Sequence, residues 1–302
     1  MKTAIISGAC GFIGFNLTTV LLENNYKVIA LVTDEKVFKN NLNPNLKVIK
    51  IFFEDYHTLI QIIKGPVDYF FHLAWAGVYG HAFKDYELQI YNSKISCLCA
   101  KQAVELGVKK FIFCSTINVL ETQDFFNKNT EIKRYTNVYA AAKLSAEMYC
   151  KVIASNSLMQ YNSVLINQVF GSGNRHPSLT NIVLKNLVNN IESNLVEYDE
   201  LYSLIHVKDV ALGLLSVATK GLNMSRYYLG NTTLETIGQT FDRIKTLVNP
   251  DGIINYGVYP ASSFIDYSLI DLNKLYNDTG FKPSSNFEEN ILDNVAWIKE
   301  NL

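Results

Sequence analysis

Short apolar runs alternate with longer amphipathic stretches over roughly the first 170 residues. The short runs are rich in Ile, Val, Phe and Leu and show little internal alternation, which is typical of strands buried on both faces. They are Ala4–Ser7, Lys27–Val32, Leu46–Ile51, Val67–Leu73, Lys110–Cys114 and Asn162–Val169. The stretches between them predict helices at about residues 12–24, 56–64, 83–107 and 137–156. This order predicts an α/β fold in which helices cover both faces of a parallel sheet.

The pattern becomes less regular beyond Gly171. Its spacing predicts a helix near 179–193, a strand near 202–206 and a helix near 207–219. We expect this part of the chain to form a smaller and looser lobe.

Composition narrows the class of protein further. The 302 residues are 48% hydrophobic and 18% charged, which excludes disordered and low-complexity chains. The formal net charge is −1, and no stretch gathers basic residues, so we do not expect nucleic acid as a partner. No apolar run approaches the roughly 18 residues that span a bilayer, and the N-terminus lacks a secretory signal pattern. We therefore expect a cytoplasmic protein with no membrane partner.

Five cysteines are present, and none forms a C-x-x-C pair. An odd number without such spacing indicates neither a disulfide framework nor a zinc site. We expect all five to be reduced, small apolar residues, and we expect no metal.

A glycine-rich turn follows the first predicted strand directly, as Gly8-Ala9-Cys10-Gly11-Phe12-Ile13-Gly14. Glycines at this spacing allow a tight turn, let the backbone approach a pyrophosphate and let the next helix pack on the sheet. The helix N-terminus then presents free N–H groups to the phosphates. The motif predicts a doubly wound, Rossmann-type domain over residues 1–170 that binds a dinucleotide, with about 203–232 returning to it. Residues 171–202 and 233–302 are expected to bind the substrate.

The choice between NAD and NADP depends on the end of the second strand. An acidic residue there usually binds the adenosine ribose of NAD, but Val32 occupies that place, and Thr33 and Asp34 follow. Lys36 and Lys39 are next and could meet a ribose phosphate. We expect either cofactor, with a slight preference for NADP.

A tyrosine and a lysine four residues apart stand out on the helix predicted over 137–156. Tyr139 and Lys143 lie on one face of it. A phenol is a poor acid or base near neutral pH, and a nearby ammonium stabilises its phenolate form. The pair can pass a proton to or from a carbonyl or hydroxyl oxygen. Ser115 and Thr116 end the fifth strand at the ligand-binding edge, where a hydroxyl can bond the same oxygen.

These motifs, taken in order, resemble the extended short-chain dehydrogenase/reductase family, also called the NAD-dependent epimerase/dehydratase family. The resemblance covers nearly the whole chain. It includes the run His72-Leu73-Ala74-Trp75, Asn92 in the next helix, Gln168-Val169-Phe170-Gly171 and Ile205-His206-Val207-Lys208-Asp209-Val210.

The resemblance implies roles for individual residues. Gly8, Gly11, Phe12, Ile13 and Gly14 would line the pyrophosphate. The other residues implied in cofactor binding are Thr33, Leu73, Ala74, Trp75, Asn92 and Ser115, together with Tyr139 and Lys143.

Catalysis and substrate binding are implied in the same way. Tyr139 would be the acid/base, Lys143 would hold the nicotinamide ribose, and Thr116 would bond the reacting oxygen. Family members act on nucleotide-diphosphate sugars, here with a role in cell-surface polysaccharide synthesis, and commonly form homodimers through the helix at 83–107. The expected substrate contacts are Gly77, Val78, His81, Thr116, Gln168, Tyr202 and Arg226, and either His81 or His176 is the candidate for a second acid/base.

Departures from the family pattern limit the reaction. Family dehydratases carry an Asp-Glu pair directly after the strand-five hydroxyl, where this chain has Ile117-Asn118. Dehydration is therefore not expected. Leu165, Gln168 and the run Glu200-Leu201-Tyr202-Ser203 also differ from the commonest epimerases.

Three functions remain open from the sequence. The leading expectation is NAD(P)-dependent reduction of the 4-keto group of a nucleotide-linked sugar. The alternative is a 4-epimerase with tightly bound NAD. A non-catalytic dinucleotide sensor is a third hypothesis, because fold alone does not determine function.

Overall fold

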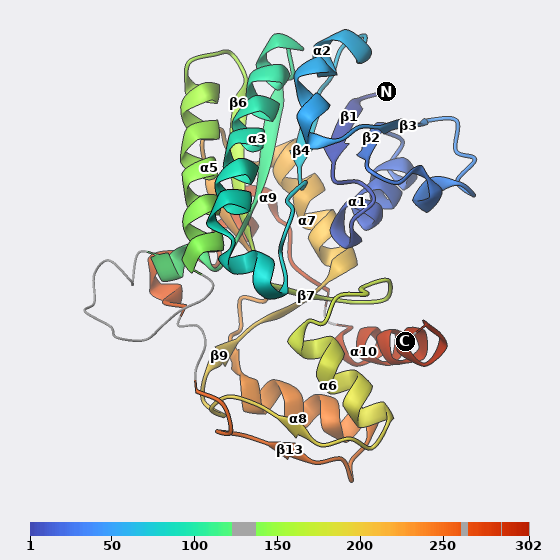
Figure 1. Ribbon diagram of the computed structural model, residues 1–302, viewed down its shortest axis with the longest axis vertical. Coiled ribbons are helices and arrows are strands. Elements are labelled where there is room, and N and C mark those ends of the chain that lie inside the picture. Colours follow the sequence, from blue (N-terminus) through green and yellow to red (C-terminus); the bar gives the residue numbers. More distant parts are fainter. Residues whose placement is uncertain (123–136, 261–264, 285, 302) are drawn as a thin grey trace.

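The computed structural model describes residues 1–122, 137–260, 265–284 and 286–301 (Figure 1). Its centre is a seven-stranded sheet with the order β11-β6-β5-β4-β1-β2-β3. All neighbouring strands pair in parallel. The strands are β1 (Thr3–Ser7), β2 (Lys27–Val32), β3 (Leu46–Lys50), β4 (Tyr69–His72), β5 (Lys110–Thr116), β6 (Gln160–Ile166) and β11 (Arg226–Leu229). This sheet confirms the predicted Rossmann-type α/β fold.

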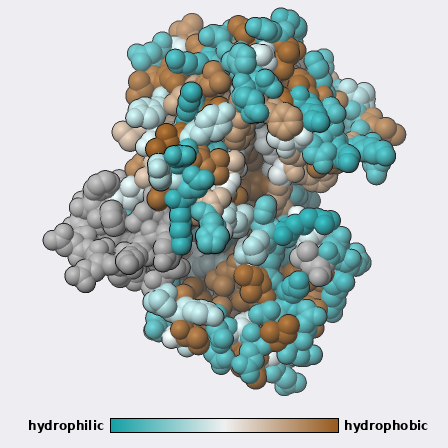
Figure 2. Space-filling view, viewed as in Figure 1, coloured by the Kyte–Doolittle hydropathy of each residue, from teal (hydrophilic) through white to brown (hydrophobic). Residues whose placement is uncertain are grey.

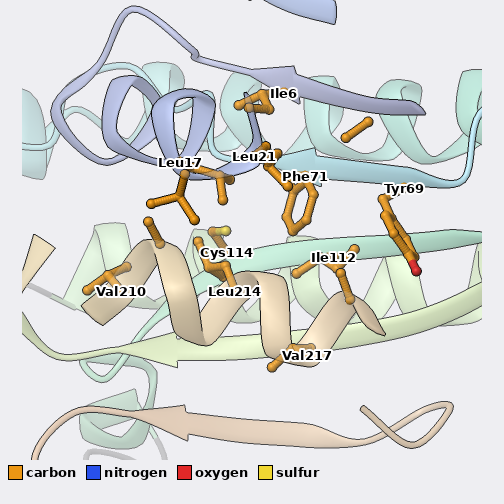
Figure 3. Packing of buried hydrophobic residues seen from close by; sticks show 14 of the residues in the cluster. Ile6, Leu17, Leu21, Tyr69, Phe71, Ile112, Cys114, Val210, Leu214 and Val217 are labelled. Atoms are coloured by element: carbon orange, nitrogen blue, oxygen red, sulfur yellow. The ribbon is translucent and has the colours of Figure 1, made fainter. Parts of the chain in front are cut away.

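Helices cover both faces of the sheet, as the sequence predicts. On one face lie α1 (Phe12–Glu23) and α7 (Val207–Lys220), and on the other α3 (Tyr86–Glu105) and α5 (Asn137–Ser155) (Figure 1). Figure 3 shows Leu17 of α1 facing Leu214 of α7, with Phe71 of β4 beside them. These side chains are fully buried, so a dry core fixes the place of α1.

A second group of helices forms the lower part of the molecule in Figure 1. It contains α6 (Leu179–Val188), α8 (Ile237–Val248) and α10 (Phe287–Asn301), which share a hydrophobic core of their own. Figure 2 shows the surface hollowed between this part and the sheet above it. The division of the chain into two domains, with the boundaries given above, stays a prediction.

The remaining elements are short. They are η1 (Glu35–Phe38), η2 (Phe53–Thr58), α2 (Leu59–Ile62), η3 (Gly80–Lys84), β7 (Gln168–Phe170), β8 (Ser193–Asn194), β9 (Leu201–Tyr202), β10 (Leu204–His206), β12 (Glu235–Thr236), β13 (Ile254–Asn255), η4 (Tyr267–Leu269) and α9 (Lys274–Thr279), where η marks a 3-10 helix.

Two expected elements are interrupted by polar side chains. The strand predicted over 162–169 breaks at Asn167, because its side-chain oxygen accepts the Gln168 N–H at 2.8 Å. The helix predicted over 83–107 begins only at Tyr86, because the Asp85 carboxylate caps it by accepting the Leu88 N–H at 3.1 Å. Residues 56–64 hold the end of the 3-10 helix η2 followed by the short α-helix α2, in place of one continuous helix.

The lobe contains helices that the hydrophobic pattern did not predict. One of them, α8, starts with a capping box in which the side chains of Thr236 and Gln239 each accept the other's backbone N–H. The spacing Thr-x-x-Gln is typical of a helix start, and the sequence analysis did not use it to predict this helix. No helix within the described residues is long and apolar enough to cross a membrane.

Candidate active site

The glycine-rich turn joins β1 to α1 and leaves no room for side chains. Gly8 has φ +71°, and a Cβ there would lie 2.9 Å from the backbone of Ala74. A Cβ on Gly14 would collide with the Gly8 carbonyl oxygen. Two segments of backbone therefore meet at this turn, and only glycine permits it.

The first turn of α1 suits an anion. Its N-cap, Gly11, provides no side-chain cap, and the first turn contains no acidic residue. The N–H groups of Phe12 and Ile13 therefore stand at a positive helix end that carries no competing carboxylate. These residues fit the pyrophosphate of a dinucleotide.

The end of β2 lies beside this turn. The Thr33 hydroxyl is 3.6 Å from the Cys10 sulfur, which places Thr33 next to the glycines. Asp34 caps the turn η1 by accepting the Lys36 N–H at 3.0 Å. Lys36 and Lys39, which follow it, are exposed.

The structure brings Tyr139 and Thr116 together. Tyr139 comes from α5 and Thr116 from the end of β5, and the two side chains are hydrogen-bonded. Burial raises the pKa of Tyr139 well above its usual value, while the bond to Thr116 acts in the opposite direction. The phenol is thus protonated at neutral pH, as a general acid must be.

Asn118 holds the Thr116 hydroxyl from its other side. The Thr116 hydroxyl donates to Asn118 Oδ1 at 2.9 Å, and Asn118 Nδ2 donates to the buried Glu121 at 2.6 Å. Asn118 stands where family dehydratases carry an acid, and in this chain it orients the Thr116 hydroxyl. The sequence analysis did not single out Glu121, although its place five residues after Thr116 could have indicated a carboxylate near this site.

Lys143 lies one helical turn beyond Tyr139 and is buried. Its Nζ donates to the Cys114 carbonyl at 2.9 Å, next to Ser115 and Thr116 on β5. Burial lowers the pKa of Lys143 to about 8, and the nearby Cys114 and Glu147 oppose that shift. The expected tuning of the Tyr139 phenol by Lys143 stays a prediction.

Trp75 covers Lys143 from the end of β4. The centroid of its ring lies 4.0 Å from Lys143 Nζ and 6.1 Å from the Tyr139 ring centroid. Its indole N–H donates to Gln89 of α3 at 2.7 Å. The indole therefore packs on both residues of the Tyr–Lys pair.

Two amides of α3 hold the loop that follows β4. Asn92 bonds both the N–H and the carbonyl of Ala76, at 3.0 and 2.8 Å. Gln89 donates to the Gly77 carbonyl at 2.8 Å. Asn92 was expected at the cofactor, and in the structure its amide is committed to this loop.

A buried chain of hydrogen bonds connects the ends of β1 and β4 to α3. The Ser7 hydroxyl accepts the Ala74 N–H and lies 2.8 Å from His72 Nδ1. The other ring nitrogen lies 2.9 Å from the Ser96 hydroxyl, which donates to the Asn92 carbonyl. Burial lowers the pKa of His72 to about 3, so the imidazole is a neutral structural link.

Aromatic rings continue from Tyr139 toward the lobe. Phe83 packs edge-on against Tyr139, with the ring centroids 4.8 Å apart. Tyr79 lies near Phe83 and stacks on His176, with a centroid distance of 4.4 Å. Partial burial lowers the pKa of His176. His81 is exposed on η3, so the structure joins only one of the two expected histidines to this aromatic row.

Arg226 does not reach the ligand-binding edge. It begins β11, and its guanidinium pairs with Glu147 of α5 at 2.7 Å. Glu147 also accepts hydrogen bonds from Ser115 and Ser163, at 3.0 and 2.8 Å. Arg226 was expected to contact the substrate, but in the structure it forms an ion pair with Glu147, and Ser115 bonds the same carboxylate.

The other expected substrate residues lie in different surroundings. Tyr202 is buried in the core of the lobe against Phe241, and burial raises its pKa to about 12. Gly77 has φ +70° and faces Leu88 of α3. Gln168 and Val78 are partly buried, and their contact with a substrate stays a prediction.

Two of the hollows in the described part of the chain have volumes of about 220 and 270 Å³. The first lies between β11 and α9, and the second is lined by His206, Arg243 and Phe287 among others. Tyr139 lines neither of them. No cluster of three or more His, Cys, Asp or Glu residues able to hold a metal occurs within the described ranges.

The parallel sheet, the glycine-rich turn and the Tyr–Lys–Thr cluster define an enzyme of the extended short-chain dehydrogenase/reductase type. Residues 4–230 match the model of the NAD dependent epimerase/dehydratase family, and the chain belongs to that family.

Individual relatives agree with this assignment. A putative UDP-glucose 4-epimerase of Methanocaldococcus jannaschii is 23% identical, and the match covers 98% of both chains. The UDP-glucose 4-epimerase of Thermotoga maritima with UDP-glucose has a TM-score of 0.82 at 23% identity and 99% coverage of both chains. The NAD complex of the Thermus thermophilus UDP-glucose 4-epimerase has a TM-score of 0.79 at 16% identity and 100% coverage of both chains.

Proposed function

We propose that this protein is an NAD-dependent 4-epimerase of a nucleotide-diphosphate sugar. The observation that carries the proposal is the contact of Tyr139 with Thr116, beside a buried Lys143, where the dehydratase acids are replaced. This set can move one proton at one sugar oxygen and lacks the groups for removing water. The UDP-sugar 4-epimerases among its relatives support the choice of substrate class.

The proposed chemistry centres on the 4-hydroxyl of the sugar. Bound NAD would supply the acceptor and later the donor of the C4 hydride. Tyr139 acts here in its phenolate form, toward which the Thr116 hydroxyl, released from Asn118, can turn and which it can stabilise. The phenolate takes the hydroxyl proton as the ketone forms, and the resulting phenol returns it at the end.

NAD is the cofactor that we propose, in place of the slight preference for NADP. Asp34 follows the end of β2. Within the described residues, its carboxylate accepts one hydrogen bond, from the Lys36 N–H in the same turn. It is therefore placed to accept ribose hydroxyls. The NADP preference was based on Lys36 and Lys39. Both side chains are exposed, so they would have to become ordered when the cofactor binds.

Reduction of a 4-keto-sugar is the second candidate function. The edge-on contact of Phe83 with Tyr139 favours it, because an epimerase must let its ketone intermediate rotate above the tyrosine. A reductase has no such requirement.

One experiment separates the two functions. The purified protein is denatured and the released dinucleotide quantified, and the native protein is then incubated with UDP-glucose, UDP-N-acetylglucosamine and UDP-glucuronic acid. Epimerisation predicts retained NAD and the C4 epimer of one sugar in the product NMR spectrum, without added cofactor. Absence of any epimer, together with stoichiometric oxidation of added NADH or NADPH by a 4-keto-sugar, overturns it in favour of the reductase.

A further inference from the structure

Two thiols meet where α3 packs against α5. Cys97 of α3 is partly exposed and Cys150 of α5 is buried, and the Cys150 thiol bonds the carbonyl of Ser96, the residue before Cys97. The reaction proposed above uses neither of them.

Independent contacts hold the two helices close at this place. The Ser93 hydroxyl of α3 donates to the Ala142 carbonyl of α5 at 2.7 Å. The Cys150 thiol donates to the Ser96 carbonyl at 3.4 Å, beside Cys97 in the chain. The buried Ala142 and Ala146 leave little side chain between the helices. The close approach of the α3 and α5 backbones therefore brings the two thiols near each other. Their proximity does not depend on the rotamer of one side chain alone.

The two thiols differ in their surroundings. The neighbouring Cys150 side chain and the charge of Lys101 lower the pKa of Cys97 to about 7, while burial opposes them. Burial raises the pKa of Cys150 well above its usual value. One accessible thiol that ionises readily beside one buried thiol is the arrangement of an attacking and a resolving cysteine.

We propose that Cys97 and Cys150 form a redox-active dithiol that a hydroperoxide converts into an intramolecular disulfide. The Cys97 thiolate attacks one peroxide oxygen, the O–O bond breaks, and the leaving hydroxide is protonated to water. The sulfenic acid on Cys97 then reacts with the Cys150 thiol, forming the S–S bond and releasing a second water. Two thiols and one hydrogen peroxide thus give one disulfide and two waters, and the sulfurs lose the two electrons that the peroxide gains.

The cross-link joins α3 to the helix that carries the Tyr–Lys pair. Cys150 lies seven residues after Lys143, two turns along the same side of α5. The disulfide also removes the thiol proton that bonds the Ser96 carbonyl. The hydroxyl of the same residue, Ser96, lies 2.9 Å from His72 at the end of β4.

The test uses the intact protein and does not depend on its activity. The native protein is treated with stoichiometric hydrogen peroxide, alkylated in denaturant with N-ethylmaleimide and digested without reduction for mass spectrometry. We expect loss of two alkylated cysteines, a linked peptide pair containing Cys97 and Cys150, and full recovery with dithiothreitol. Cys97→Ser and Cys150→Ser each abolish the linked pair, and the matched variant Cys99→Ser on the same helix retains it.

A second measurement needs no peroxide. The rate of Cys97 alkylation in the native protein, followed against pH, should show a midpoint below the ordinary thiol value of about 8.5. Cys150→Ala should move that midpoint upward.

Three results of the peroxide experiment overturn the proposal. They are full alkylation of both cysteines after peroxide, peroxide products confined to sulfinic or sulfonic acid, and a disulfide that joins two chains. A Cys97 midpoint at or above the ordinary value has the same effect, and it is measured on the wild-type protein, so a variant that fails to fold does not prevent the test.

Discussion

The Lys143 ammonium lies 4.0 Å from the centroid of the Trp75 ring, and donates at the same time to the Cys114 carbonyl. The ring comes from the end of β4, and the ammonium comes from α5. The bond from the indole to Gln89 anchors the ring on α3. Trp75 thus holds the ammonium of Lys143 in a dry site, where a cation–π contact contributes up to about 2 kcal/mol.

Trp75→Ala should lower kcat/KM by about tenfold or more, because the lysine loses both its cover and its orientation. Trp75→Phe keeps an aromatic face and should retain activity within about threefold. Trp297→Phe is the matched control, since Trp297 lies on α10 in the lobe. Steady-state kinetics and circular dichroism check the prediction, and equal activities of the Ala and Phe variants would contradict it.

Tyr139→Phe should lower turnover by at least about a hundredfold, because the sugar oxygen then has no phenolic proton to exchange. Retention of bound dinucleotide is the control, since the phenolic hydroxyl is not needed for the pyrophosphate site. Near-wild-type turnover of the variant would remove Tyr139 from the mechanism. A non-catalytic sensor also predicts no effect of this substitution on its biological output.

The activity should fall as the pH rises through about 8, because Lys143 then loses the proton that charges it. Glu147 opposes this loss, so Glu147→Gln should move that limb of the kcat/KM profile to lower pH. Glu235→Gln is the matched control, because it breaks an Arg–Glu pair in the lobe. A limb that stays in place in Glu147→Gln would show that Glu147 does not act on the lysine.

Gly11→Asp should abolish dinucleotide binding, since it places a carboxylate at the N-terminus of α1 against the pyrophosphate. Gly11→Asn has almost the same size without the charge and should bind more tightly than the aspartate variant. A Cβ at Gly11 meets only the Gly8 carbonyl oxygen, at 3.2 Å, so both variants should fold. Retained NAD and the thermal shift on adding NAD measure the effect. Equal binding by the two variants would refute the electrostatic explanation.

His72 should make the protein acid-sensitive. Its pKa is about 3 in the folded state and about 6.5 in the unfolded chain, so only the unfolded chain gains this proton as the pH falls below about 6.5. Stability is then lost progressively, by about 1.4 kcal/mol per pH unit, until the pH approaches the folded value. His72→Asn should remove this component from urea unfolding measured between pH 6 and 4. The same pH slope in both proteins would contradict it.

Local signals were enough to predict the α/β class, the glycine-rich turn and the Tyr139–Lys143 pair. A buried parallel strand must be a continuous apolar run, a tight turn at a helix start needs glycine, and a spacing of four places two side chains on one helix face. Each of these constraints acts between residues that are close in the chain, so the sequence is enough to show it. The capping box of α8 belongs to the same kind, and it was overlooked.

Contacts between distant segments could be decided only by the tertiary structure. Arg226 is read from the sequence as a free cation, and it becomes an ion-pair partner only because β11 and α5 bring it to Glu147. The placement of Trp75 over Lys143 and the meeting of Cys97 with Cys150 also depend on how α5 packs against its neighbours. Burial has the same origin: it sets the pKa of Lys143 and of His72, and it follows from the whole packed interior rather than from the residues on either side.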